Sequence, residues 1–214
     1  MGLTNLGLHK LESYRTMDGY YLNSFFIKRD YCNYLLFPPY HVELYKDIFI
    51  SKGGVGRQLI TNPSQLNFGC EKTFNTFGAS AVLFKTEQAR DVSTEQLKVL
   101  KVDFWGEDFF DKDIIFTPFN ESSLCWFRLL HQGKYFLVTD EKLIAHHQGW
   151  RQSRVNPLTE EEKNFLREFP IDKDFKIDYL IPRCHDGEFY LKKLTPESLI
   201  ENINLFLNDE GTKK

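Results

Sequence analysis

The chain has 214 residues and a formal net charge of -3, so it is long enough for a single domain with a substantial core, expected to span residues 1–214. This slightly acidic balance provides no global basic field, and neither nucleic acid nor a membrane is therefore expected as a partner. The sequence begins without a signal-peptide pattern and contains no apolar run of about 18 residues, which predicts a soluble, cytoplasmic protein.

In the first half of the chain, aromatic and β-branched runs alternate with helical patterns. Strands are predicted over residues 20–29 and 32–37, joined as a hairpin at Asp30-Tyr31. Helical spacing of apolar residues predicts a helix over 41–51. The next predicted elements are a strand over 57–61, a helix over 65–77 that ends at Gly78, and a strand over 80–84.

The second half is rich in strands and ends in helices. Strands are predicted over 97–104, 113–118, 124–131 and 134–139, the last two joined by a tight turn at Gln132-Gly133. A capping box, Thr159-x-x-Glu162, predicts a helix over 159–169. Strands over 178–182 and 188–194 and a helix from 196 to about 207, introduced by Thr195, complete the chain. This mixture predicts sheets covered by helices, an α/β (α+β) fold.

The glycines in Lys52-Gly53-Gly54-Val55-Gly56 suggest a phosphate-binding loop, but the order of elements argues against one. A phosphate loop needs a strand before the glycines and a helix N-terminus after them, because the helix amides hold the anion. Here the predicted order is helix, glycines, strand. Gly53 and Gly54 are therefore interpreted as a helix stop and tight turn.

The four cysteines are Cys32, Cys70, Cys125 and Cys184, and no two of them form a C-x-x-C pair. Their wide spacing predicts buried thiols in a reducing compartment, not a disulfide framework or a structural zinc site.

Three segments, in order and with comparable spacing, resemble motifs of metallo-β-lactamase-fold hydrolases. GGVGRQLITNPSQLNFG resembles the place where a helix ends in Gly-Gly and a strand ends in Thr-His-x-His-x-Asp-His. IIFTPFNESSLCWFRLLHQGKYFLVTD resembles the Thr-Pro-Gly-His-Thr/Ser segment, followed by a hairpin and a strand ending in Gly-Asp. FKIDYLIPRCHDGEF resembles the strand ending in Pro-Gly-His-Gly. The resemblance implies a four-layer αβ/βα sandwich with a metal site at the sheet edge.

The family's metal ligands lie within these motifs, and most of their positions carry other residues here. In the first motif Thr61 is kept, but the ligand positions fall on Asn62, Ser64, Leu66 and Asn67. A zinc that activates water needs about three imidazole, carboxylate or thiolate ligands, and these residues do not supply them.

The later motifs keep at most two ligands. Phe119-Asn120 stands where Gly-His is expected, whereas Asp140 keeps the bridging Asp. His185 keeps the last ligand if one extra residue is allowed; otherwise Cys184 takes that position. The degenerate site would then be a polar pocket without metal, formed by Thr61, Asn62, Ser64, Asn67, Asn120, Asp140 and His185.

Two functions of different class follow from the resemblance. The preferred one is a non-catalytic binding or regulatory module, without a cofactor, whose partner is a small molecule or a protein. The alternative is a metal-dependent hydrolase with a rebuilt mononuclear site that holds one Zn, Fe or Mn ion on Asp140, His185 or Cys184, and Glu121. In the simplest interpretation of the residues themselves, Asp140 ends a strand through hydrogen bonds and His185 lies in a polar loop.

Two further sets of residues invite a functional interpretation. His146-His147 with Trp150, Arg151 and Arg154 could form an anion or partner site, although a solvated loop or helix leading to Pro157 is preferred. Ser122 and Ser123 near Asp140 could suggest a nucleophile, but no G-x-S-x-G elbow surrounds them. The many aromatic residues are expected in the core.

Overall fold

The computed structural model describes residues 3–16, 19–84, 100–116, 124–146, 149–154, 156–169, 171, 174–187 and 192–208. Its contacts divide the chain into two compact units. Unit 1 comprises Met1–Ser13 and Asn23–Lys112, and unit 2 comprises Tyr14–Leu22 and Asp113–Lys214. The single domain expected over residues 1–214 stays a prediction.

Unit 1 contains a mixed sheet with two helices on one face. Its elements are η1 (Leu3–Leu6), β1 (Leu8–Arg15), β2 (Tyr21–Ile27), β3 (Tyr34–Leu36), η2 (Val42–Tyr45), α1 (Lys46–Ser51), β4 (Arg57–Ile60), η3 (Pro63–Gln65), α2 (Phe68–Phe77), β5 (Ser80–Leu83) and β6 (Val102–Phe104). The strands follow the order β6-β5-β4-β3-β2, with β1 paired to β2. β3 to β6 are parallel, so their carboxyl ends lie at one edge.

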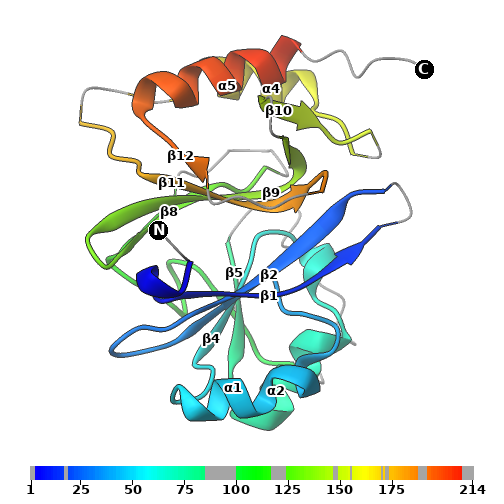
Figure 1. The fold of residues 1–214 in the computed structure, drawn as a ribbon, viewed down its shortest axis with the longest axis vertical. Coiled ribbons are helices and arrows are strands. Elements are labelled where there is room, and N and C mark those ends of the chain that lie inside the picture. The colour runs from blue at the N-terminus through cyan, green and yellow to red at the C-terminus, as the bar shows by residue number, and fades with distance from the viewer. Residues whose placement is uncertain are drawn as a thin grey trace. The chain divides into compact units, whose positions relative to one another are not determined.

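The helices α1 and α2 lie on the same side of the unit 1 strands (Figure 1). Burial of apolar side chains holds them there. Phe49 of α1 packs on Phe26 with ring centroids 5.1 Å apart. Cys70 of α2 lies in a second apolar cluster with residues of β4 and β5. Between them, the buried Gln58 donates its amide N–H groups to the carbonyl oxygens of Cys70 (3.0 Å) and Ala79 (2.7 Å). Each such bond contributes about 1 kcal/mol, and together they fix α2 against β4.

The predicted helix ends in unit 1 are confirmed. α1 is followed by Gly53 (φ 94°) and Gly54 (φ 80°), both in the left-handed region that favours glycine. α2 ends at Gly78, which adopts the left-handed conformation of a C-terminal cap. The strand β4 begins after the glycines, so the predicted order of helix, glycines and strand holds. The start of α2 differs from the prediction, because residues 63–65 form a separate 3-10 turn and Asn67 caps the helix.

Unit 2 contains further strands and two helices, α4 and α5, that cover them. Its elements are β7 (Ile114–Phe116), β8 (Phe127–His131), β9 (Lys134–His146), β10 (Gly149–Gln152), α4 (Glu160–Arg167), β11 (Tyr179–His185), β12 (Lys192–Lys193) and α5 (Pro196–Asn208). The strand order is β11-β9-β8-β7, and β10 and β12 pair with β9 and β11. β11 also pairs with Tyr21 and Leu22, which belong to this unit.

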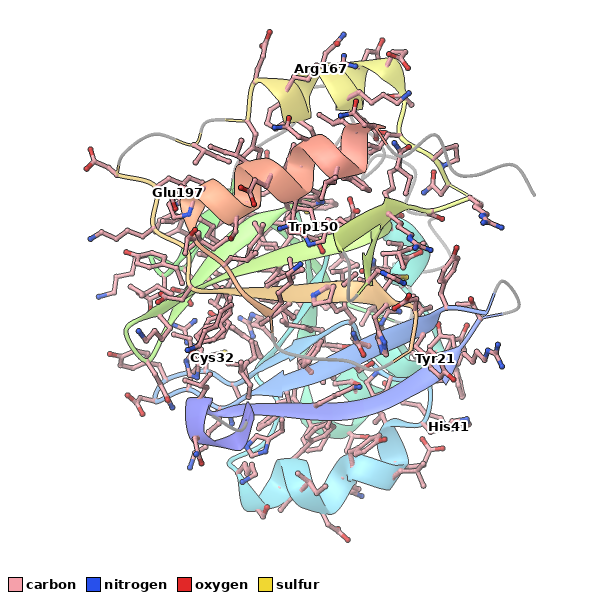
Figure 2. All side chains as sticks on the ribbon, turned by 45° about the horizontal axis from the view of Figure 1, so that its top comes forward. Tyr21, Cys32, His41, Trp150, Arg167 and Glu197 are labelled. Atoms are coloured by element: carbon pink, nitrogen blue, oxygen red, sulfur yellow. The ribbon has the colours of Figure 1, made fainter. Side chains whose placement is uncertain are left out.

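The core of unit 2 is a large aromatic and aliphatic cluster (Figure 2). Trp126 and Trp150 meet edge to face at 5.9 Å, and Phe206 of α5 lies 6.3 Å from Trp126. Trp150 is 2% exposed. The predicted solvated loop or helix near Trp150 is therefore wrong: residues 149–152 form β10, antiparallel to β9.

The longest strand, β9, is interrupted at Asp140. Thr139 pairs with Pro182 of β11, but the next pair is Ile144 with Cys184. Residues 140–143 therefore stand opposite Arg183 alone, a large bulge in a parallel pair. The prediction that the strand ends at Thr139 is wrong, because pairing resumes beyond the bulge and continues to His146.

The bulge places a buried cation next to α4. Lys142 donates to both carboxylate oxygens of Glu162 (2.7 and 2.6 Å), and the two side chains are only 5% and 1% exposed. Glu162 also accepts from the backbone N–H of Thr159 (2.8 Å), and Thr159 Oγ1 accepts from that of Glu162 (3.2 Å). The predicted capping box is confirmed, and its glutamate has a second role as the partner of Lys142.

The described residues have a mixed α/β architecture, as expected from the sequence. None of the four cysteines, all of which are described, forms a disulfide. Within the described ranges, no helix combines the length and apolar character needed to cross a membrane.

Glu162→Ala is expected to lower the free energy of unfolding by about 3 to 5 kcal/mol. It leaves the Lys142 ammonium buried without its partner, and it removes the capping-box hydrogen bond from the Thr159 N–H to Glu162. Urea unfolding followed by circular dichroism measures this change. Glu161→Ala, an exposed neighbour in the same helical turn, is the control and should change the free energy by less than about 0.5 kcal/mol. Equal effects of the two substitutions would contradict a buried ion pair.

Candidate functional site

The first motif of the resemblance lies at the carboxyl edge of the parallel strands in unit 1, where open α/β sheets commonly bind ligands. β4 ends at Ile60, and the segment 61–67 leads into α2. Its first residue, Thr61, is 1% exposed, and Gln65 is 3% exposed. The Gln65 side chain accepts from the backbone N–H of Thr61 (3.1 Å) and donates to its hydroxyl (2.9 Å). This pair closes the segment upon itself.

Two of the four ligand positions in this segment have evident structural roles. Leu66 is buried in the apolar cluster with Ile60, Cys70 and Leu83. Asn67 is the N-cap of α2, where its side-chain oxygen accepts from the backbone N–H of Cys70 (3.1 Å). A cap of this kind contributes about 1 kcal/mol. Neither residue is of a type that commonly binds metal. Each one stabilises the fold, Leu66 by burial and Asn67 by capping α2.

The other two ligand positions in this segment are Asn62 and Ser64. Asn62 is partly buried, and its backbone carbonyl accepts from the N–H of Gln65 (2.9 Å). The side chain of Ser64 lies outside what the structure describes.

The same edge carries a strained residue that the sequence did not indicate. Phe37, directly after β3, has φ 55°, which is unusual for a bulky side chain. It is fully buried. Close by, α2 approaches the chain so tightly that a Cβ on Gly69 would lie 2.0 Å from the Pro39 carbonyl oxygen. Such strain persists only where the surrounding structure imposes it.

Asp140, the best preserved ligand of the resemblance, is engaged by the backbone of unit 2. One carboxylate oxygen accepts from the N–H of Cys125 (2.9 Å) and the other from that of Lys142 (3.0 Å). Burial raises the pKa of Asp140 to about 7, although the two hydrogen bonds and the charge of Lys142 act in the opposite direction. The expected hydrogen bonds of Asp140 are present, but they shape the bulge in β9 and do not end the strand.

Residues 182–185 of the last motif lie in β11 and are buried, whereas Asp186 and Gly187 follow the strand and are exposed. Burial raises the pKa of the Cys184 thiol to about 12, and the side chain packs with Leu22 and Ile144. His185 is 2% exposed and stacks on Tyr21 with ring centroids 5.3 Å apart. Its Nδ1 accepts from the N–H of Gly187 (3.3 Å). The interpretation of His185 as a loop residue is therefore wrong, because it is the final residue of a buried strand.

The remaining predicted site residues, Asn120 and Glu121, lie outside the described residues, as do Ser122 and Ser123. In the part of the chain that the structure describes, no three His, Cys, Asp or Glu side chains cluster closely enough to hold a metal ion. An apolar Leu66, a capping Asn67 and a thiol whose pKa is raised by burial form a poor donor set. The described residues do not fit the di-metal centre of the family.

At the anion or partner site predicted around His146, the histidine side chain contacts a residue of its own chain. His146 Nε2 lies 2.7 Å from a carboxylate oxygen of Asp186, with the two side chains 9% and 28% exposed. Trp150 cannot offer a stacking face because it is buried in the core of unit 2. His147 lies outside the described residues.

Sequence reasoning missed Gln65, Lys142 and Glu141 as partners in these segments. The first closes the segment 61–67, the second binds Glu162, and the third lies 3.9 Å from Arg183. The one available signal was the charged run Asp140-Glu141-Lys142 within an otherwise apolar strand, which is typical of a bulge or functional interruption.

The raised pKa of Asp140 makes stability depend on pH. An unfolded Asp ionises near pH 4, whereas the folded residue keeps its proton to about pH 7, so folding binds more protons between these values. Stability from this group is therefore present below about pH 4 and is lost as the pH rises to about 7, by no more than about 4 kcal/mol. Asp140→Asn should remove this part of the pH dependence in urea unfolding measured from pH 4 to 8. Parallel pH profiles for the two proteins would contradict it.

Restoring a ligand in the first motif is expected to conflict with the fold. Leu66→Asp should lower the free energy of unfolding by about 3 kcal/mol or more, because it removes a buried side chain and places a carboxylate among apolar residues. Asn62→His, at a partly buried position of the same segment, should cost less than about 1 kcal/mol. Thermal and urea unfolding of both variants test this difference, and a tolerated Leu66→Asp would contradict the structural role of Leu66.

Comparison with known proteins identifies the fold. No protein-family model matches the sequence, and no curated protein matches it in a sequence search. Among solved structures, the chain is similar to DIM-1 metallo-β-lactamase exposed to ceftazidime, with a TM-score of 0.58 and 10% identity over 92% of each chain. It is also similar to native FEZ-1 metallo-β-lactamase from Legionella gormanii, with a TM-score of 0.51 and 14% identity over 93% of this chain and 94% of that one.

A third similar structure is the metallo-β-lactamase from Hirschia baltica, with a TM-score of 0.50 and 9% identity over 92% of this chain and 98% of that chain. Identities this low establish a shared fold and not a shared activity. The resemblance inferred from the three motifs is confirmed at this level: the chain has a divergent metallo-β-lactamase fold.

Proposed function

We propose that this protein is a pseudoenzyme of the metallo-β-lactamase fold, which has lost the di-metal hydrolase centre and acts as a non-catalytic binding or regulatory module. The proposal rests on one observation: residues at the expected ligand positions have structural roles instead. Leu66 is part of the core and Asn67 caps α2. The four-layer αβ/βα sandwich of the family stays a prediction alongside this proposal.

The chemistry of these residues supports a binding role over catalysis. A hydrolytic zinc needs ligands that are deprotonated and available, with an open position for water. Both oxygens of Asp140 already accept backbone N–H bonds, and burial keeps the Cys184 thiol protonated at neutral pH. The amide of the partly buried Asn62, at one of the ligand positions, is instead of a type suited to hydrogen bonding a neutral small molecule or a protein segment. We accordingly propose no cofactor.

The metal content of the purified protein tests this proposal. After expression in medium supplemented with zinc, iron and manganese, mass spectrometry should find less than about 0.1 equivalent of any of them per chain, because about three suitable ligands are needed to retain one ion. The same measurement on Asp140→Ala is the control, and the two proteins should give the same low value.

The opposite result would support the rebuilt mononuclear site. About one ion per chain, lost on Asp140→Ala but kept in a surface variant such as Glu161→Ala, would contradict the loss of the metal centre. Hydrolysis of a substrate panel that depends on that ion would contradict the non-catalytic role as well. Asp140→Asn retains one oxygen acceptor, so it distinguishes loss of a ligand from loss of folding.

A further inference from the structure

A tight turn after β6, formed by residues 105–110, presents aromatic side chains on a rigid backbone. The N–H groups of Glu107 (3.2 Å), Asp108 (2.9 Å) and Phe109 (3.3 Å) all point to the carbonyl oxygen of Phe104. Gly106, with φ 81°, donates to the Phe109 carbonyl at 2.8 Å. A backbone fixed in this way loses little entropy when the turn binds a partner. We name residues 105–110 the aromatic turn.

The aromatic turn exposes an apolar surface to solvent. Phe110 is 71% exposed, and its ring lies 5.6 Å from that of the partly buried Trp105. Trp105 in turn meets Phe109 at 5.7 Å. An exposed aromatic ring held against a partly buried one is typical of a recognition surface, since a large apolar side chain gains nothing by facing water.

The same turn already binds a cation of its own chain. The guanidinium carbon of Arg57 lies 5.4 Å from the centre of the Phe109 ring. A second guanidinium, that of Arg29, lies 4.8 Å from the centre of the Tyr34 ring, and Tyr34 meets Phe109 edge to face. Cations over aromatic faces are favourable, and arginine is the most frequent donor of such contacts.

Charge at the turn is complementary to a cation as well. Glu107 and Asp108 are exposed and stand between the aromatic residues in sequence. One carboxylate oxygen of Asp108 accepts from the Phe104 N–H at 2.9 Å, which fixes the position of its charge. A guanidinium stacked on Trp105 and Phe110 would therefore meet negative charge in the same turn.

From these observations we infer that the aromatic turn is a docking surface for an arginine-bearing segment of a partner protein. The guanidinium stacks on the Trp105 and Phe110 rings, and the carboxylates of Glu107 and Asp108 attract it. This inference is independent of the proposed loss of the metal centre, because the turn is built from other residues of unit 1.

Tryptophan fluorescence tests the docking surface directly, with a hexa-arginine peptide as the probe. Trp126 and Trp150 are 1% and 2% exposed, so a change on adding the peptide reports mainly Trp105. Titration should give a saturable change that weakens as the salt concentration rises, because the charges at the turn are screened. Hexa-glutamate should give no saturable change. An equal response to both peptides, or no response to hexa-arginine, would overturn the inference.

Two variants separate the aromatic and charged contributions. Phe110→Ala and the pair Glu107→Gln with Asp108→Asn should each weaken hexa-arginine binding by about threefold to tenfold, as expected for one cation–π or charged contact. Phe68→Ala, which removes another exposed ring from unit 1, is the matched control and should leave the affinity unchanged. Circular dichroism establishes that each variant is folded. Unchanged binding by Phe110→Ala would overturn the inference, as would an equal loss in Phe68→Ala.

Discussion

The carboxylate of Asp140 and its two backbone hydrogen bonds determine the path of the chain through unit 2. By accepting from Cys125 and Lys142, it stabilises the bulge at which β9 leaves β11 and later rejoins it. The bulge in turn directs Lys142 to Glu162. Glu162 is also part of the capping box of α4. The buried Asp140 is therefore connected, through the Lys142–Glu162 ion pair, to the start of the helix that covers the core. A buried polar group in such a position must be fully satisfied, and here each one has a partner.

The segment 61–67 in unit 1 obeys the same constraint with different groups. Its amide and hydroxyl side chains satisfy one another, because Gln65 bonds to Thr61 and Asn67 bonds to the first turn of α2. A metal-binding segment can be ordered by the ion that its ligands hold. Here the ordering comes from hydrogen bonds and from burial of Leu66. Contacts within the chain therefore hold the segment 61–67 in place.

Local features of this fold could be predicted from the sequence because short-range chemistry determines them. The capping box at Thr159 and Glu162, the helix stop at Gly53-Gly54 and the turn at Gln132-Gly133 each depend on a few adjacent residues. The three motifs also indicated the fold, and the similarity to solved metallo-β-lactamase structures confirms it.

Features that depend on distant partners could not be predicted in this way. β10 forms because it pairs with β9, and the continuation of β9 to His146 pairs with both β10 and β11. No local sequence pattern predicts these pairings. The role of Asp140 depends on Cys125, and that of Lys142 on Glu162, partners that lie well away along the chain. His185 was assigned to a loop because its sequence neighbours are polar, yet pairing with Tyr21 buries it. Asn120 and Glu121 lie outside the described residues, so their predicted roles stay predictions.

We propose that contacts within the chain, and not a metal ion, order these segments. The free energy of unfolding, measured in urea with a strong chelator and again with added zinc, tests it most directly. A protein that binds no metal in its folded state has the same stability in both conditions. Equal free energies of unfolding, within the error of the extrapolation, are expected for this protein. A stability that rises with zinc concentration, or that falls when the chelator is added, would contradict it.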